Sequence, residues 1–240
     1  MFHSHSSYTP KRPSQHKASH PTTAPPPMPS FTAIIDADHD AINAAAVRLA
    51  RLLRSPAPTS TTPEDLHAIR RRQLALLHDV TWRLVRHDLS EELVMRPAFI
   101  RHMGPIAGRE AAEHDRQDHE NARRTLLELY AAFEACAVGD AQTAGVLTER
   151  YLALLAELAE HMKRESGEEM PALEAGLGRE ESVELGRRYM ETLVVTPELV
   201  LRGRRVFRDV GDFVHASKQS LLQVWAEVQR EEQRRRGGRL

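Results

Sequence analysis

The sequence predicts an all-α protein organised as an up-down-up-down four-helix bundle. From Phe31 onward, apolar residues recur at steps of three and four, which places them on one face of a helix. No stretch combines the period-two alternation and the β-branched enrichment that are typical of strands. Four long helical stretches also follow one another with short breaks that contain Gly or Pro, and short connections favour antiparallel neighbours.

The breaks and a capping signal give the bounds of the predicted helices. Thr62 is suited to be an N-cap and Pro63 occupies the first helical position that proline prefers, so the second helix begins there. We expect the bundle helices over residues 31–54, 63–95, 105–137 and 141–169. Two more helices are expected after the bundle, over residues 180–194 and 197–232. The longer of these has an apolar stripe that either packs back on the bundle or binds a partner protein or a second copy of the chain.

Composition divides the chain into three parts. Residues 1–30 hold seven of the 14 prolines and no acidic residue, and such a segment cannot bury enough apolar surface to offset its ordering entropy. We therefore expect a disordered Pro-, Ser- and His-rich tail over 1–30, a four-helix bundle over 31–175 and a helical C-terminal extension over 176–240.

Charge and cysteine content exclude several classes of function. The formal net charge is −1, so no basic field attracts nucleic acid or an anionic membrane. The single cysteine, Cys136, excludes an intramolecular disulfide and a thiolate-rich metal site, and it fits a reducing compartment. No apolar run approaches the ~20 residues that span a bilayer. We expect a soluble, cytoplasmic protein, with mitochondrial or peroxisomal targeting only weakly suggested by the two ends of the chain.

Polar residues interrupt the apolar stripes of all four bundle helices. Two of the interruptions have the same form, a histidine followed by a glutamate four residues later and a proline ten residues after the histidine. Residues four apart lie on one helix face, so each pair points to the same place. Every stripe contains one histidine, namely His39, His87, His119 and His161. Three stripes also contain a carboxylate, namely Glu91, Asp115 and Glu165.

A four-helix bundle would bury these side chains together. Burying an ionised carboxylate without a partner costs several kcal/mol, which is comparable with the stability of a whole domain, so a positive charge must accompany them. Four imidazoles and three carboxylates could ligate two metal ions, or some of them could ligate one ion while the others hydrogen-bond to its ligands. In an up-down-up-down bundle the histidines of all four helices, with their neighbouring carboxylates, also lie at the same end. We therefore predict a metal site formed by His39, His87, Glu91, Asp115, His119, His161 and Glu165.

The remaining histidines are not placed on these stripes. His114 lies about 140° around the helix from His119 and is expected to flank the site. Asp88 and Asp118 are neighbouring alternatives to the predicted carboxylate ligands. We expect no role in the site for His67, His78, His102 and His215.

With these motifs in place, residues 31–173 resemble the hemerythrin-like family, the HHE cation-binding domains. The residues that carry the resemblance are Asp38-His39, His87-x-x-x-Glu91 with Pro97, Asp118-His119, and His161-x-x-x-Glu165 with Pro171. The resemblance implies a four-helix bundle with a non-haem centre of two iron ions, together with an O2-derived bridging ligand, that binds O2 or senses oxygen or iron. It also implies that the matching residues are the ligands.

The chain departs from the oxygen-carrying hemerythrins at two positions. The carriers have a second histidine four residues before the ligand of the third helix, where this chain has Asp115, and an aspartate where it has Ser166. The resemblance is therefore closer to family members with mixed histidine and carboxylate ligands than to the carriers.

Three functions are consistent with the predicted site. The first is an iron-binding protein that binds or senses O2, peroxide or iron, with metal ions and small O2-type molecules as its partners. The second is an enzyme with oxidase or peroxidase activity, which would need an open coordination position and a substrate channel that the sequence does not indicate. The third is a structural bundle clamped by zinc. A binding role is favoured over an enzyme, without nucleic acid or membrane as partners, and a homo-oligomer could form through the C-terminal helix.

Overall fold

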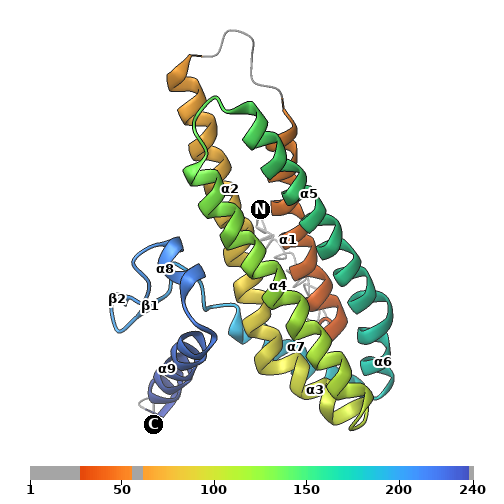
Figure 1. The fold of residues 1–240 in the computed structure, drawn as a ribbon. Coiled ribbons are helices and arrows are strands. Elements are labelled where there is room, and N and C mark those ends of the chain that lie inside the picture. The colour runs from red at the N-terminus through yellow and green to blue at the C-terminus, as the bar shows by residue number, and fades with distance from the viewer. Residues whose placement is uncertain (1–27, 56–61, 238–240) are drawn as a thin grey trace, which may run out of the picture.

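The computed structural model describes residues 28–55 and 62–237. Helices account for nearly all of its regular structure, and the four longest are α1 (Phe31–Arg54), α2 (Pro63–Ser90), α4 (Ala107–Ala135) and α5 (Ala141–Arg164). They run side by side in alternating directions (Figure 1). The predicted all-α four-helix bundle is confirmed. No helix within the described ranges combines the length and the hydropathy that crossing a bilayer requires.

The ends of the bundle helices follow local rules. Ser30 caps α1 by accepting a hydrogen bond from the backbone N–H of Ala33. Thr62 caps α2 as predicted, and Asp65 completes a capping box by bonding back to the Thr62 backbone. The predicted disorder of residues 1–30 concerns residues that lie almost wholly outside those described, since only 28–30 are included.

Two of the predicted helix ends are wrong, because the chain stays helical beyond them. After α2, a π-helical turn η1 (Glu91–Met95) leads into α3 (Arg96–His102), and after α5 a π-helical turn η2 (Glu165–Glu169) leads into α6 (Met170–Ala175). Proline in a helix lacks an N–H and its ring clashes with the carbonyl four residues back, which predicted an ending. The widened turn removes this conflict, so Pro97 and Pro171 each sit in the first turn of a further helix.

The C-terminal extension begins with α7 (Arg179–Thr192), close to the predicted helix over 180–194. The predicted single helix over 197–232 is wrong. A short antiparallel hairpin, β1 (Val200–Leu201) with β2 (Arg204–Arg205), comes first, followed by α8 (Val210–His215) and α9 (Lys218–Gly237). Arg202 and Gly203 form the hairpin turn with positive φ angles of 51° and 76°.

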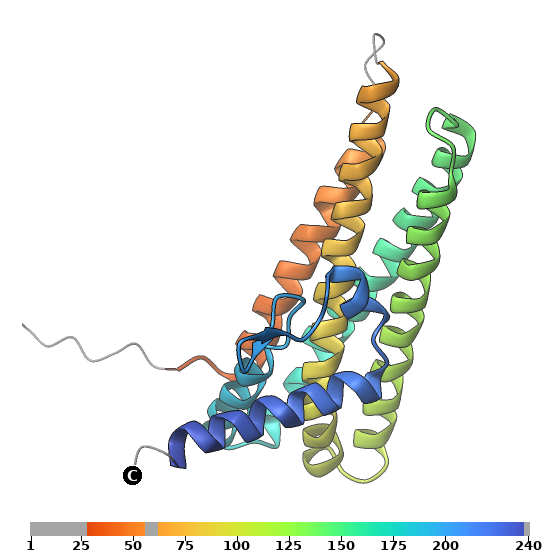
Figure 2. The same cartoon turned by 90° about the vertical axis from the view of Figure 1, so that its left-hand side faces the viewer.

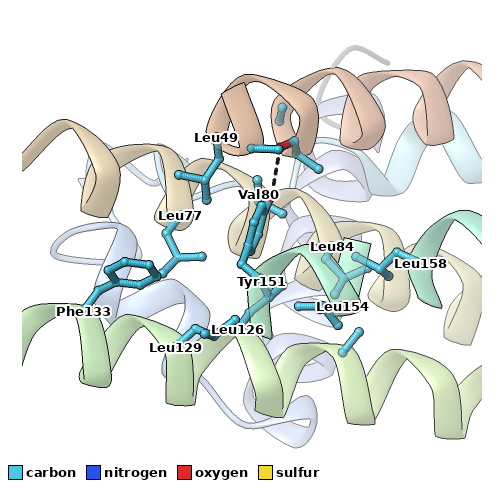
Figure 3. Close-up of a cluster of buried hydrophobic side chains, with 14 of the residues drawn as sticks. Leu49, Leu77, Val80, Leu84, Leu126, Leu129, Phe133, Tyr151, Leu154 and Leu158 are labelled. Atoms are coloured by element: carbon cyan, nitrogen blue, oxygen red, sulfur yellow. Dashed lines mark hydrogen bonds between the residues drawn. The ribbon is translucent and has the colours of Figure 1, made fainter. Parts of the chain in front are cut away.

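The buried apolar side chains form three clusters, and each cluster joins a different set of elements. The largest fills one half of the bundle between α1, α2, α4 and α5. Figure 3 shows Leu77, Leu126 and Leu154 among the side chains of this cluster, and the hydroxyl of Tyr151 donates a hydrogen bond of 2.9 Å to the carbonyl of Ala46. This apolar cluster contains no predicted site residue.

A second cluster joins the opposite end of the bundle to α3, α6 and α7, with Phe31, Phe99 and Tyr189 fully buried in it. The third cluster fixes α8 and the start of α9 on α2 through Phe213, Leu221 and Val85. Figure 2 shows α9 crossing the flank of the bundle. Of the two roles considered for the apolar stripe of the extension, packing back on the bundle is therefore the one that these side chains adopt. Association of copies through α9 stays a prediction, as does the division of the chain at residue 175.

Candidate metal centre

The seven predicted site residues lie between the two apolar ends of the bundle. α1 supplies His39, and the first half of α4 supplies Asp115 and His119. Each of the two repeated motifs spans the end of an α-helix and the start of a π-turn, so its histidine and its glutamate lie one turn apart. All seven are at most 5% exposed. They fall into two groups whose candidate ligand atoms lie within 4.8 Å of one another: His39, His87, Glu91 and Glu165; and Asp115, His119 and His161.

The first group is organised around two facing imidazoles. The Nε2 atoms of His39 and His87 are 3.2 Å apart. An Oε1 atom of Glu91 lies 2.9 Å from Nε2 of His87, and Oε2 of Glu165 lies 3.4 Å from Nε2 of His39. Two nitrogens and two carboxylates therefore point to one small volume.

The second group contains Asp115 and two more imidazoles. Oδ1 of Asp115 is 3.8 Å from Nε2 of His161 and 3.7 Å from Nδ1 of His119. The rings of His119 and His161 pack edge to face with centroids 4.6 Å apart. The acid that stands where oxygen carriers have a histidine thus belongs to the second group of candidate ligands.

Two carboxylates connect the groups. Glu91 contacts His87 of the first group through Oε1 and His119 of the second through Oε2, the latter at 3.0 Å. Oε2 of Glu165 is 3.4 Å from Nε2 of His39 and also 3.4 Å from Nε2 of His161. Carboxylates placed in this way can bridge two ions, which is the arrangement that di-metal carboxylate bundles use.

Several polar atoms of the site have no hydrogen-bond partner among the described residues. Buried atoms without a hydrogen bond include both oxygens of Glu91, both oxygens of Glu165, Oδ1 of Asp115, Nε2 of His119 and Nε2 of His161. Leaving so many buried polar atoms unpaired would cost several kcal/mol. Cations would satisfy them, and nitrogen with oxygen donors suits iron as well as zinc or manganese. The residues present therefore fit a metal centre.

Asp38 and Tyr189 contact the ring nitrogen of His87 that points away from the first group. Nδ1 of His87 lies 3.2 Å from Oδ2 of Asp38 and 2.7 Å from the hydroxyl of Tyr189, and this hydroxyl donates to Asp38 at 2.9 Å. Arg86 donates to the other oxygen of Asp38. An acceptor on the outer nitrogen fixes the orientation of a ligand histidine and raises its basicity. The C-terminal extension thus contributes directly to the site, because Tyr189 belongs to α7.

Two other histidines have equivalent outer contacts. Nδ1 of His161 lies 3.1 Å from Oδ2 of Asp118, which Arg164 also contacts at 2.6 Å. Nδ1 of His39 lies 3.2 Å from the hydroxyl of Ser166, which donates to Asp36 at 2.7 Å. Asp118 therefore lies just outside the groups as an orienting residue.

Burial and neighbouring charges shift the pKa values of the site in opposite directions. Burial favours a neutral imidazole, but the carboxylates of Glu91 and Asp38 outweigh it and raise the pKa of His87 to about 10. His161 is also buried, and its neighbour His119 adds a positive charge, so its pKa falls to about 3. Burial and the charge of Glu91 raise the pKa of Asp115 well above its usual value. A bound cation would release protons from His87 and Asp115, whose raised pKa values keep them protonated without metal.

Other residues weighed from the sequence lie outside the two groups. Asp88 is paired with Arg96 at 2.7 Å and lies 3.9 Å from Lys218. His114 is about half exposed and 3.9 Å from Glu169, as expected for a flanking residue. His78 stacks on Tyr130, and His67, His102 and His215 also belong to neither group.

Surface hollows reach the site on both sides of α5. A cavity of about 420 Å³ between α1 and α5 is lined by His39 and Ser166, and one of about 290 Å³ between α4 and α5 is lined by His161, Asp118 and Arg164. Each hollow therefore borders one residue of a different group, His39 of the first and His161 of the second.

Comparison with known proteins agrees with this arrangement. The chain is similar to an uncharacterized hemerythrin-like protein of Schizosaccharomyces pombe, with 29% identity over 116 residues. The resemblance to hemerythrin-like proteins is confirmed. The match covers 48% of this chain and 53% of the relative, so the chain spans about half the length of the curated relative that it matches. No family model and no solved structure matches the chain.

Sequence reasoning did not identify two residues of this candidate site, Arg96 and Tyr189. Arg96 lies one residue beyond the predicted end of its helix, where an arginine is normally solvated. Tyr189 is separated from His87 by 102 positions, and no local pattern indicates such a contact. The sequence did give one indirect signal, which was the demand for positive charge among buried acids.

Proposed function

We propose that this hemerythrin-like chain binds two non-haem iron ions and uses them to bind or sense O2, peroxide or the supply of iron. The proposal is supported above all by two adjoining groups of buried ligands that share Glu91 and Glu165. Mixed imidazole and carboxylate donors favour a hard, oxidisable ion such as iron. Bound iron would supply the redox couple on which O2 or peroxide chemistry depends.

The protein residues would have separable tasks in this function. Glu91 and Glu165 would connect the two ions, while Asp38, Asp118 and Ser166 would orient the imidazoles. The hollows beside His39 and His161 would admit small diatomic or peroxide molecules. A reducing compartment such as the cytoplasm suits this proposal, because Cys136 is a free, buried thiol.

Metal analysis of the full chain tests the proposal. Protein purified in air should contain about two irons per chain, one for each group of ligands. Its absorption should bleach with a reductant and return with air. Zinc at full occupancy, with no redox response, would favour a structural clamp instead.

Catalysis is a second candidate, favoured by the hollow that reaches His161. Peroxide consumption by the iron-loaded protein should then fall sharply in His161→Ala. If turnover survives that substitution, it does not arise at this centre, and a binding or sensing role remains.

A further inference from the structure

Arg96 places a fixed positive charge inside the candidate centre. This residue begins α3 and is only 4% exposed. Its Nε donates to Oδ2 of Asp115, and its Nη2 donates to Asp88 at 2.7 Å and lies 3.3 Å from Nδ1 of His119. Arginine cannot lose its proton in a protein, so this charge does not disappear when a metal approaches.

The π-turn explains how Arg96 reaches this place. The backbone N–H of Arg96 bonds to the carbonyl of Glu91, five residues earlier. Five-residue spacing brings the arginine onto the face that carries Glu91, with Nη2 4.0 Å from the Glu91 carboxylate. In a standard α-helix, at about 100° per residue, Arg96 would lie about 140° around the helix from Glu91.

The first group meets a guanidinium only at a longer distance, through the 4.0 Å contact between Glu91 and Arg96. Within residues 28–55 and 62–237, Glu165 forms no ion pair with a lysine or an arginine. The guanidinium on this side of the site belongs to Arg86, and it contacts Asp38, which is one step removed from the group. The two groups are therefore electrostatically unequal.

We infer that Arg96 makes the two groups bind metal in a fixed order, with the first ion held by His39, His87, Glu91 and Glu165. The second ion would enter the group of Asp115, His119 and His161, where it meets the guanidinium already in contact with Asp115. Like charges at close range in a buried site repel strongly. Arg96 also occupies one oxygen of Asp115 and leaves the unpaired Oδ1 as its single ligand atom. This inference rests on the proposed two-ion function.

Unequal binding suits a centre that senses iron. The first group would stay filled at metal concentrations that leave the second group largely empty. At those metal concentrations the charge of Arg96 would balance the nearby carboxylates of Asp115 and Asp88. The second group could then stay empty without leaving buried negative charge unpaired. Occupancy of the second group would then follow the metal supply.

Stepwise metal titration of the full, metal-free chain tests the inference. Fe²⁺ under anaerobic conditions and Co²⁺ as a redox-stable probe would be titrated against a competing chelator. We expect two dissociation constants at least about tenfold apart. Arg96→Gln should lower the dissociation constant of the second step by about tenfold or more, which is the scale on which residues around the ligands alter metal affinity. It should leave the dissociation constant of the first step within about threefold of its value in the unaltered chain. Arg96→Lys, which keeps the charge, should preserve most of the gap.

Arg86→Gln provides a matched control, since it removes a partly buried guanidinium from the other side of the site. It should tighten the first step and widen the gap. Two equal steps in the unaltered chain, or an unchanged gap in Arg96→Gln, would overturn the inference while leaving the two-ion proposal intact. If the unaltered chain binds neither ion, the proposed function itself is wrong.

Single-histidine variants identify the order even if Arg96→Gln does not fold. His161→Ala should retain the tight step and lose the weak one, whereas His39→Ala should lose the tight step. The reverse pattern would show that the group next to Arg96 fills first, against the inference.

Discussion

At the scale of single residues, Tyr189 offers a direct test of the outer contacts. Tyr189→Phe removes the hydroxyl that contacts both His87 and Asp38, with little change in shape. Metal affinity should fall about tenfold, because the ligand histidine loses part of its orientation. Competition with a chelator of known affinity would measure this change.

Tyr151 gives the matched control for that substitution. It is also a fully buried tyrosine with one hydrogen bond, but its partner is the carbonyl of Ala46 in the apolar half of the bundle. Tyr151→Phe should cost about 1 kcal/mol of stability and leave metal affinity unchanged. Equal effects of both substitutions on metal affinity would contradict a specific role for Tyr189.

Glu169 gives the metal-free protein a specific dependence on pH. Burial and the nearby charge of Glu165 raise its pKa to about 7. The folded state therefore holds a proton that the unfolded state releases near pH 4.5, so stability falls as pH rises from 4.5 through 7. Over this range the loss should be about 1–3 kcal/mol, given 1.36 kcal/mol per pKa unit.

The substitution Glu169→Gln removes this titration. The variant should match the unaltered chain near pH 4.5 and exceed its stability at pH 8, as measured by chemical denaturation in the presence of a chelator. Glu168→Gln, at an exposed neighbouring position, controls for the loss of charge on the same turn. A constant difference between Glu169→Gln and the unaltered chain at all pH values would contradict this explanation.

At the scale of elements, the close approach of α3 to α4 depends on Gly108. A Cβ atom at this position would lie 2.1 Å from the carbonyl oxygen of Phe99, and backbone atoms cannot move aside as a flexible side chain can. Gly108→Ala should therefore cost about 1–3 kcal/mol. Since α3 carries Arg96, the substitution should also disturb the Arg96–Asp115 contact.

Gly145, in α5, is the matched control, because a Cβ atom there would meet nothing within 4 Å. Gly145→Ala should stabilise the protein by up to about 1 kcal/mol through helix propensity alone. Denaturation curves of the two variants should shift in opposite directions. If both variants gain stability, the contact between α3 and α4 is looser than the structure indicates.

At the scale of the whole molecule, the sequence predicted the parts of the architecture that depend on helical periodicity. The apolar stripes determined the four bundle helices, and the same phase brought His87 and His161 to one level with their glutamates. Continuation of the helix through Pro97 was not predictable from periodicity, because a π-turn changes the number of residues per turn. The hairpin of β1 and β2 was also missed, since two-residue strands are too short to show alternation.

The residues that complete the site could not be predicted for a related reason. Periodicity identifies the face of a helix, but it does not identify which distant element covers that face. Tyr189 reaches His87 only because α7 packs on α1, where Gly186 comes close to Ile34 and Phe31. The demand for positive charge was predicted, whereas its partial satisfaction by Arg96 depends on the local geometry of η1.

Metal should stabilise the whole molecule without being needed for its helices. The apolar half of the bundle packs around Leu77, Leu126 and Tyr151 and contains no predicted ligand, so the metal-free chain should keep its helical circular dichroism. A tightly bound ion at a thousandfold over its Kd adds about 4 kcal/mol. For a chain of this size that corresponds to roughly 8–16 °C in Tm, at about 2–4 °C per kcal/mol.

The substitution His87→Ala separates metal binding from packing. Its Tm should fall much further below that of the unaltered chain when both are loaded with metal than when both are metal-free, because only the loaded unaltered chain has the complete first group. Thermal unfolding followed by circular dichroism, with and without chelator, would measure both differences. Equal losses in the two conditions would mean that His87 only packs, and the centre would then have to be assigned to other residues.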